Sequence, residues 1–129
     1  MPDFNVLRRT FLGSATVTAA SYSRILGAND RILMGVIGPG DRGRHDMSLF
    51  QLDKSVEVAA LCDIYAEQID RAKQKAPGAR TFRDHRKLLE MKELNLVLIA
   101  TPDHWHAQTA IDALNAGKDV YVEKPLSLT

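Results

Sequence analysis

The chain has 129 residues, of which 45% are apolar, and it carries 17 Lys and Arg against 16 Asp and Glu. This length allows one small domain or part of a larger one, and the apolar fraction is typical of a globular protein rather than a disordered one. The net charge of +1 gives no basic field for nucleic acid, the single cysteine excludes an intramolecular disulfide framework, and no apolar run is long enough for an ordinary membrane-spanning helix.

Residues 1–29 have the composition of an export leader. They carry three arginines, Arg8, Arg9 and Arg24, against one acidic residue. The Arg8-Arg9 pair precedes a weakly apolar run, 11–20, that is rich in Ala, Ser and Thr, and this order resembles a twin-arginine signal. We therefore expect export to the periplasm by the twin-arginine translocase, with the signal either cleaved or kept as an anchor. The alternative is that the two arginines are solvated charges in front of an ordinary amphipathic helix.

After the leader, the sequence alternates short apolar runs with amphipathic stretches. Apolar runs bounded by turn residues predict strands, and apolar residues spaced at i, i+3, i+4 and i+7 predict helices. In chain order, the first half is predicted to contain a strand at 31–37, a helix ending near residue 52, a strand at 56–62 and a helix at 66–76 that Pro77-Gly78 ends.

The second half continues the alternation. The apolar stripe of its longer helix is predicted to be Ala107, Ala110, Ile111 and Leu114, with Gly117 as the C-terminal cap. In chain order, the predicted elements are a short strand at 81–82, a helix that Asp84 caps and that runs to about residue 92, a strand at 96–100, the longer helix, and a last strand at 119–123.

Repeated strand–helix units predict the fold class. They indicate an α/β protein with a Rossmann-like, doubly wound parallel sheet, right-handed crossovers and helices on both faces. The run 96–100 is apolar throughout, as expected for a strand that is covered on both faces. We therefore divide the chain into a leader, 1–29, and one α/β domain, 30–129.

The segment Gly38-Pro39-Gly40-Asp41-Arg42-Gly43 follows the first predicted strand and matches G-x-G-x-x-G, a dinucleotide-binding pattern. In this pattern Gly38 permits the tight turn, Gly40 lets a pyrophosphate approach because it lacks a Cβ, and Gly43 lets the helix sit close to the sheet. The helix N-terminus then offers unpaired N–H groups to the phosphates. The competing interpretation is a glycine turn required only for its geometry, but three glycines at this spacing exceed what a turn needs.

Asp63 ends the second long predicted strand, where an acidic residue can bind the adenosine ribose hydroxyls and repel the extra phosphate of NADP. NAD is therefore the expected cofactor. Arg42 and Arg44 lie close enough in sequence to leave NADP open. The alternative role for Asp63 is that of an N-cap for the helix at 66–76.

Two further motifs follow later strands. Thr101-Pro102-Asp103-His104-Trp105-His106 comes after the strand at 96–100, and Glu123-Lys124-Pro125 comes at the end of the last strand. Both stand at carboxyl ends of strands, where an open parallel sheet places its ligand crevice. Together with the glycine loop, in this order and spacing, they resemble the Gfo/Idh/MocA family over residues 31–129.

The resemblance implies an NAD(P)-binding Rossmann domain and hydride transfer to or from sugars, cyclitols or polyols. It implies that Lys124 lies near the nicotinamide and the substrate, with Glu123 before it and Pro125 holding the turn. It places His106 near the nicotinamide half of the cofactor, so Lys124 and His106 are the candidate catalytic residues, and Thr101 and Pro102 join the candidate cofactor-binding set.

Family members also take a catalytic Asp/His pair from a second α/β domain, which is absent from this sequence. The resemblance therefore implies that the substrate binds through the missing domain, that these 129 residues alone are inactive, and that homo-oligomers form only in a full-length protein. The expected parent is an NAD(P)-dependent oxidoreductase. Two other functions stay open: a glycoside hydrolase of the same fold that uses bound NAD, and a non-catalytic nucleotide-binding fragment.

The candidate catalytic residues can be interpreted in two ways, as catalytic groups or as ordinary structural residues. Lys124 can take or relay a hydroxyl proton, or polarise the oxygen, and Glu123 favours its charged form if the two side chains meet. Alternatively, Lys124 is a surface lysine and His106 is a histidine at a helix start.

Asp103, His104 and His106 suggest a metal site, but zinc needs three or four converging ligands, so we expect no metal. Buried Cys62 is expected to be inert.

Overall fold

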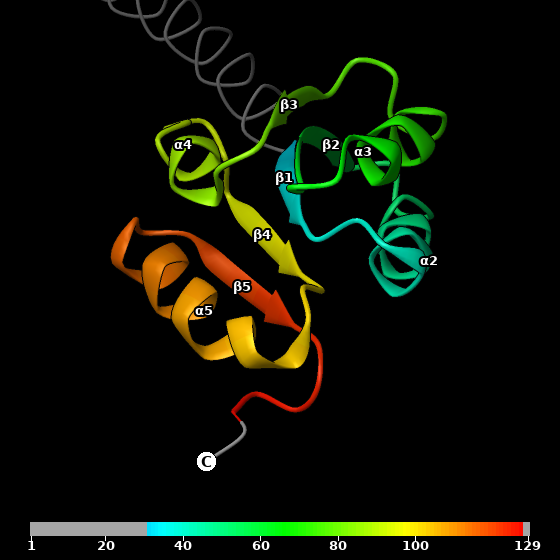
Figure 1. The fold of residues 1–129 in the computed structure, drawn as a ribbon. Coiled ribbons are helices and arrows are strands. Elements are labelled where there is room, and N and C mark those ends of the chain that lie inside the picture. Colours follow the sequence, from blue (N-terminus) through cyan, green and yellow to red (C-terminus); the bar gives the residue numbers. More distant parts are fainter. Residues whose placement is uncertain (1–30, 128–129) are drawn as a thin grey trace, which may run out of the picture. The chain divides into compact units, whose positions relative to one another are not determined.

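The predicted strands form a single parallel sheet in a computed structural model of the chain, which describes residues 31–127 (Figure 1). The sheet order is β3-β2-β1-β4-β5, and every neighbouring pair is parallel. This confirms the α/β, Rossmann-like fold class. The strands are β1 (Ile32–Ile37), β2 (Val56–Cys62), β3 (Arg80–Phe82), β4 (Leu96–Ile99) and β5 (Asp119–Val122).

Helices cover both faces of the sheet, as crossovers between parallel strands require. In Figure 1, α4 and α5 lie to the left of the strands and α2 and α3 lie to their right. The helices are α2 (Asp41–Phe50), α3 (Ala66–Lys73), α4 (His85–Leu89) and α5 (His106–Asn115), with a 3₁₀ turn, η1 (Asp103–Trp105), directly before α5.

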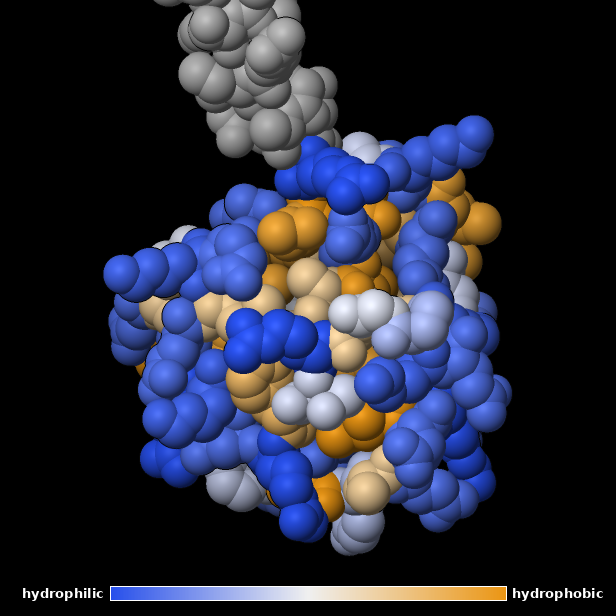
Figure 2. Space-filling view, turned by 90° about the horizontal axis from the view of Figure 1, so that it is seen from above, coloured by the Kyte–Doolittle hydropathy of each residue, from blue (hydrophilic) through white to orange (hydrophobic). Residues whose placement is uncertain are grey.

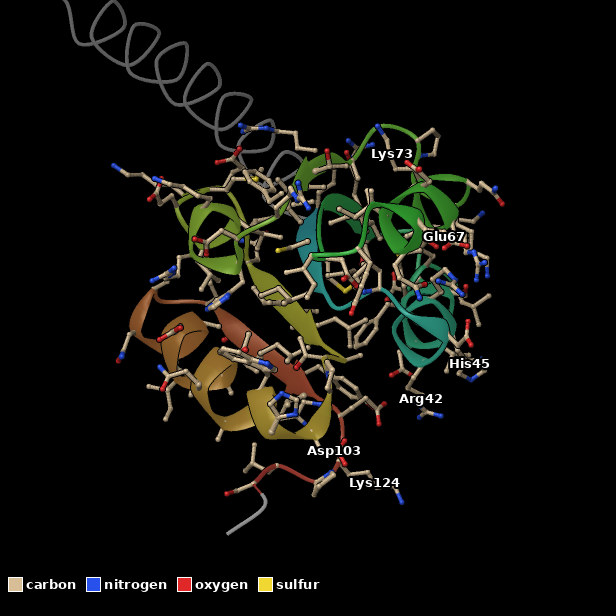
Figure 3. All side chains as sticks on the ribbon, in the orientation of Figure 1. Arg42, His45, Glu67, Lys73, Asp103 and Lys124 are labelled. Carbon is tan, nitrogen blue, oxygen red and sulfur yellow. The ribbon has the colours of Figure 1, made fainter. Side chains whose placement is uncertain are left out.

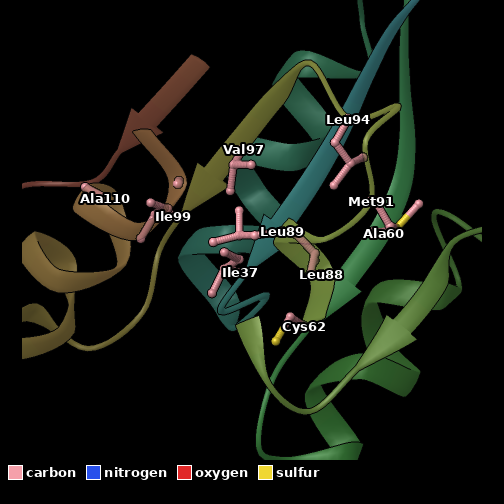
Figure 4. Packing of buried hydrophobic residues seen from close by; sticks show 11 residues of the cluster. Ile37, Ala60, Cys62, Leu88, Leu89, Met91, Leu94, Val97, Ile99 and Ala110 are labelled. Carbon is pink, nitrogen blue, oxygen red and sulfur yellow. The ribbon is translucent and has the colours of Figure 1, made fainter. Parts of the chain in front are cut away.

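Each face of the sheet has its own apolar core because successive side chains of a strand point in opposite directions. In β1, Met34 and Val36 belong to the cluster packed against α2 and α3, whereas Ile37 belongs to the cluster packed against α4 and α5 (Figure 4). Gly35 faces the second cluster, where an added Cβ would lie 3.0 Å from a Leu88 methyl group. Burial on both faces explains why these strands are continuous apolar runs.

The predicted helix boundaries agree with the structure where a specific capping residue marks them. Asp84 caps α4 as expected, because its Oδ1 accepts a hydrogen bond of 2.9 Å from the Arg86 N–H. Gly117 closes α5 with a positive φ of 76°, and the Lys118 N–H donates to the Ala113 carbonyl at 3.1 Å. The C-terminal ends of two other helices come earlier than predicted: α4 ends at Leu89, and α3 ends at Lys73, with turns between it and Pro77.

The predicted apolar stripe of α5 is wrong by one residue. Ile111 and Leu114 are 52% and 60% exposed, and the buried positions are His106, Thr109, Ala110 and Ala113. The His106 ring is held by two backbone carbonyls beside the first turn, and this sets the rotation of the helix about its axis. Small side chains therefore face the sheet, and the larger apolar ones face outward.

The predicted leader, 1–29, lies outside the described residues. Within residues 31–127, no helix is long and apolar enough to cross a membrane. Figure 2 shows one face of the molecule, which is mostly hydrophilic with smaller apolar areas between the charged side chains. Such a mixture is usual for the surface of a globular domain.

Candidate functional site

The carboxyl ends of three strands bring the predicted motifs to one edge of the sheet. The glycine loop follows β1, the segment 101–106 follows β4, and the Glu-Lys-Pro segment follows β5. Strands β1 and β4 are neighbours, and the chain winds outward from them in opposite directions. Such a switch point opens the crevice in which doubly wound sheets bind ligands. Figure 3 shows Arg42, Asp103 and Lys124 on this same side of the molecule.

Two glycines of the loop are required by close contacts with backbone. Gly38 has a φ of 81°, and a Cβ there would lie 2.7 Å from the Thr101 nitrogen. A Cβ on Gly43 would lie 2.4 Å from the Gly38 carbonyl oxygen. Real Cβ contacts are not this short, so side chains at these positions would push the loop away from β4 and α2 away from the loop. The roles expected for these two glycines agree with the geometry.

Gly40 is different because nothing in the described protein lies near it. A Cβ built on Gly40 has no atom within 4 Å, and Gly40 is the N-cap of α2 without a side-chain cap. The first-turn N–H groups of α2 are therefore open to an anion. Asp41 would oppose an anion there, but the Arg44 guanidinium pairs with its carboxylate. The open glycine and the uncapped helix fit the phosphates of a dinucleotide.

The two arginines of the loop region face opposite directions. Arg44 donates to the Pro39 carbonyl at 2.9 Å and to Gln68 of α3 at 2.6 Å. Arg42 instead donates from Nε to Glu123, beyond β5, at 3.0 Å. From sequence alone, either arginine could bind the extra phosphate of NADP. Only Arg44 lies on the side of the loop where α3 follows Asp63.

Asp63 is not the N-cap of α3, so that alternative is wrong. The N-cap is Tyr65, and it has no side-chain cap. One carboxylate oxygen of Asp63 accepts the Tyr65 N–H at 2.9 Å, which shapes the turn after β2. Within residues 31–127, no hydrogen bond reaches its second oxygen, which leaves an acceptor at the end of the strand.

His106 is buried and joins two of the motif loops. Its side chain is 1% exposed. Nδ1 lies 2.8 Å from the Pro125 carbonyl oxygen, and Nε2 lies 2.7 Å from the Thr101 carbonyl oxygen. A neutral imidazole has one N–H and donates to one of these carbonyls, whereas the imidazolium donates to both. The ring therefore holds the segment after β5 against the segment after β4, and it does not face solvent.

Glu123 turns back towards α2, away from the ammonium group of Lys124. Its carboxylate binds Arg42, and the neighbouring Asp46 carboxyl, the Arg42 guanidinium and the Lys124 backbone N–H hold its pKa below the ordinary range. Lys124 is exposed, and the described residues place no carboxylate against its ammonium group. The condition stated for Glu123, that the two side chains meet, is therefore not met in this geometry.

Asp46 is a site residue that sequence reasoning missed. It is 3% exposed in the middle of α2, and its Oδ1 lies 3.2 Å from Arg42 Nε. Burial raises the pKa of its carboxyl, and the neighbouring Glu123 carboxylate raises it further. The available signal was its position three residues after Gly43, on the apolar side of a helix that faces the sheet.

Two buried polar atoms have no hydrogen-bond partner among the described residues. One is the Asp46 Oδ2 atom, and the other is the Thr101 hydroxyl oxygen at the end of β4. Buried polar groups are nearly always paired in folded proteins. An unpaired hydroxyl at the carboxyl end of β4, beside Gly38, fits a hydrogen bond to a ligand in the crevice.

Other features lie away from this edge. A surface hollow lined by residues such as Asn95, Gly117 and Lys118 lies at the opposite ends of β4 and β5. Lys118 is buried there and donates from Nζ to the Met91 carbonyl at 2.7 Å, so its ammonium group is held by the backbone. Cys62 is buried in β2, and burial raises its pKa to about 12, which suppresses the reactive thiolate.

Comparison with known proteins adds the family. Residues 32–129 match the model of the Gfo/Idh/MocA family, described as an oxidoreductase family with an NAD-binding Rossmann fold. A protein named alpha-N-acetylgalactosaminidase from Shewanella oneidensis is 37% identical over 107 residues, which are 76% of this chain and 23% of that protein. A glycosyl hydrolase family 109 protein from Shewanella sp. strain W3-18-1 is 37% identical over 109 residues, 78% of this chain and 24% of that protein.

Solved structures show the same fold. Myo-inositol dehydrogenase from Lactobacillus casei, in complex with NAD(H) and myo-inositol, has a TM-score of 0.72 and 30% identity, covering 77% of this chain and 30% of that one. Biliverdin reductase from Synechocystis, in complex with biliverdin and NADP+, has a TM-score of 0.69 and 28% identity, covering 76% and 31%. The chain spans about a quarter of the length of the curated relatives that it matches.

Proposed function

We propose that this chain, which belongs to the Gfo/Idh/MocA oxidoreductase family and forms its NAD-binding Rossmann domain, serves hydride transfer between nicotinamide and a carbinol of a sugar, cyclitol or polyol. One observation supports this proposal most strongly. Gly40 and the uncapped start of α2 are open at this edge of the sheet, and the hydrogen bond from Arg42 to Glu123 joins α2 to the segment that bears Lys124. A phosphate cradle joined to a free ammonium group suits this chemistry.

The proposed cofactor contacts follow the crevice. Residues 38–43 would hold the pyrophosphate, the free oxygen of Asp63 would bind the adenosine ribose, and Thr101, Pro102 and Glu123 would contact the nicotinamide half. NAD is favoured over NADP because Asp63 would repel a 2′-phosphate, and because Arg42 is already engaged by Glu123. Arg44 is bonded to Pro39 and Gln68, so it would have to leave these partners to bind that phosphate.

When bound, the nicotinamide ring supplies the hydride acceptor or donor. The chain must then manage the hydroxyl proton, because a carbinol that loses a hydride must also lose that proton. Lys124 is the proposed catalytic residue, since its ammonium group is exposed at this edge and carries no ion pair in the described part. His106 is proposed as a positioning residue, because its ring holds the backbone on both sides of the crevice and is itself buried.

A second candidate is glycoside hydrolysis in which bound NAD would oxidise the sugar and the NADH so formed would later reduce it again, with no net change in the cofactor. The observation that favours it is the similarity to the proteins named alpha-N-acetylgalactosaminidase and glycosyl hydrolase family 109. Both candidates share the first hydride transfer and so make the same demands on the glycine loop, Asp63 and Lys124. They differ in whether reduced cofactor accumulates.

The test uses the complete gene product, with sugars, cyclitols and chromogenic glycosides offered separately in the presence of NAD. Accumulation of NADH with a free polyol or sugar supports the dehydrogenase. Release of the chromophore without net NADH supports the hydrolase and overturns the first proposal. If neither reaction occurs while NAD binds, both catalytic proposals fail and a nucleotide-binding role alone remains.

We also propose export through the twin-arginine pathway, on the basis of Arg8-Arg9 and the small-residue run that follows. A cofactor that is bound in the cytoplasm suits a pathway that carries folded proteins.

A further inference from the structure

We propose that Asp46 is a positioning residue that shares a proton with Glu123 and thereby ties the Glu123–Lys124 segment to helix α2. The inference rests on the proposed function, because it assigns Lys124 its place beside the reacting carbinol. It concerns how α2, whose start faces the phosphates, and the segment after β5, which carries the lysine, are held in one arrangement.

The geometry places two carboxyl groups around one guanidinium group. Arg42 Nε lies 3.2 Å from Asp46 Oδ1 and 3.0 Å from Glu123 Oε1, so both acids lie beside one nitrogen whose N–H donates to Glu123. The side chain of Asp46 is 3% exposed and that of Glu123 is 12% exposed, whereas Arg42 is largely in solvent. The second oxygen of Asp46 is buried and has no donor among the described residues.

A shared proton resolves this arrangement. Two adjacent carboxyl groups do not both ionise easily when only one cation lies between them, and burial penalises the charged form. Asp46 is the more buried group, so the proton resides on Asp46 and its hydroxyl donates to Glu123. The unpaired oxygen then gains a partner, and Glu123 keeps its negative charge for Arg42. The pKa directions agree, since that of Asp46 is raised and that of Glu123 is lowered.

The charged groups around the pair decide its pH dependence. Arg42 and His45, on the same helix, lower the pKa of Asp46, and Glu123, from beyond β5, raises it. Tyr121 of β5 acts on Arg42, and the Lys124 backbone N–H binds Glu123. Because the pKa of Asp46 is raised on folding, the hydrogen bond is present at low pH and is lost as pH rises through that pKa. Two carboxylates then share one guanidinium group, and their repulsion loosens the segment.

The expected consequence is specific to the reaction. The dinucleotide phosphates meet the start of α2, which does not need the proton, whereas the lysine depends on the position of the Glu123 backbone. Loss of the proton should therefore lower turnover more than NAD affinity. A residue that only stabilised the fold would lower both together.

The first test compares Asp46→Asn and Asp46→Leu in the complete gene product. The asparagine amide still donates to Glu123 but cannot ionise, so its kcat should stay within about threefold of wild type at a pH where the wild-type Asp46 carboxyl is protonated, and the loss of kcat as pH rises through the pKa of Asp46 should disappear. Leucine removes the donor, so kcat should fall at least tenfold while the Kd for NAD changes less than threefold. Asp112→Asn is the matched control, because it makes the same exchange at a part-buried acid paired with His85, on the other face of the sheet.

Equal activity of the leucine variant and wild type would overturn the proposal, as would an asparagine variant that is as impaired as leucine or that keeps the wild-type pH profile. A second measurement does not depend on enzymatic activity and does not need the leucine variant. The infrared spectrum of wild-type protein, minus that of Asp46→Asn, should contain the carbonyl band of a protonated carboxylic acid at pH values above the ordinary titration range of an aspartic acid. Its absence overturns the shared proton even if the proposed reaction is confirmed, and its presence supports the shared proton even if that reaction fails.

Discussion

Alanine at Gly40 and alanine at Gly43 should have opposite effects on stability although both sit in one six-residue motif. At Gly43 the new Cβ would lie 2.4 Å from the Gly38 carbonyl oxygen and 3.3 Å from the Ala100 Cβ. The nearest atom is backbone and cannot rotate away, so α2 must move by roughly half an ångström or more. Overpacking of this kind destabilises a protein by about 1–3 kcal/mol.

At Gly40 the Cβ meets no protein atom within 4 Å, and the backbone, with φ −67° and ψ −165°, is extended and accessible to alanine. Replacing glycine by alanine at such a position stabilises a protein by about 0.4–1 kcal/mol, because the unfolded chain loses freedom. The same methyl group stands where the pyrophosphate should approach. We therefore expect the Kd for NAD to rise at least tenfold, which is about 1.4 kcal/mol of binding free energy.

The assays are denaturant unfolding and NAD titration on wild type and both variants. Gly40→Ala should unfold at an equal or higher denaturant concentration and bind NAD poorly. Gly43→Ala should lose both stability and binding. If Gly40→Ala bound NAD with wild-type affinity, the phosphates would not approach the backbone at this glycine and the assignment of the cradle would be refuted.

Two further predictions concern the same site, and a third concerns the leader. Asp63→Ala should weaken NAD binding and reduce the preference for NAD over NADP, measured as the ratio of the two Kd values; unchanged affinities would leave Asp63 with only its turn hydrogen bond to Tyr65. Lys124→Met in the complete gene product should lower kcat at least a hundredfold with little change in NAD affinity, since the amine is removed but the cradle is intact; equal loss of both would indicate a structural lysine. Replacing Arg8 and Arg9 together by lysine should retain the protein in the cytoplasm of a host with a twin-arginine translocase, measured by fractionation, and unaltered periplasmic yield would contradict the export proposal.

Sequence periodicity predicted the strands well because burial on both faces leaves long apolar runs that little else explains. The glycine motif could also be interpreted from sequence, because Gly38 and Gly43 are required by close backbone contacts and Gly40 by the open space beside it. Helix rotation was less accessible. The apolar stripe of α5 was misplaced by one residue because His106 is polar in type but buried, and it orients the helix through hydrogen bonds that periodicity does not record.

Long-range polar contacts account for the rest of what sequence missed. Arg42 and Glu123 are 81 positions apart, yet they are hydrogen-bonded. Nothing local distinguishes Arg42 from Arg44, and only the sheet order shows that one turns towards β5 and the other towards α3. Asp46 carried a weak signal as an acid on a sheet-facing helix, but its partner after β5 could be identified only in the folded chain.

The central claim is that NAD held at this edge exchanges a hydride with a carbinol, in a dehydrogenase or in a hydrolase that restores its cofactor. The most direct measurement is a single-turnover experiment in which the complete gene product with NAD is mixed rapidly with sugars, cyclitols or glycosides while NADH absorbance is recorded. We predict that NADH accumulates with a dehydrogenase substrate, or rises and decays within one turnover with a glycoside. Product formation from any of these compounds without NADH at any time would contradict it.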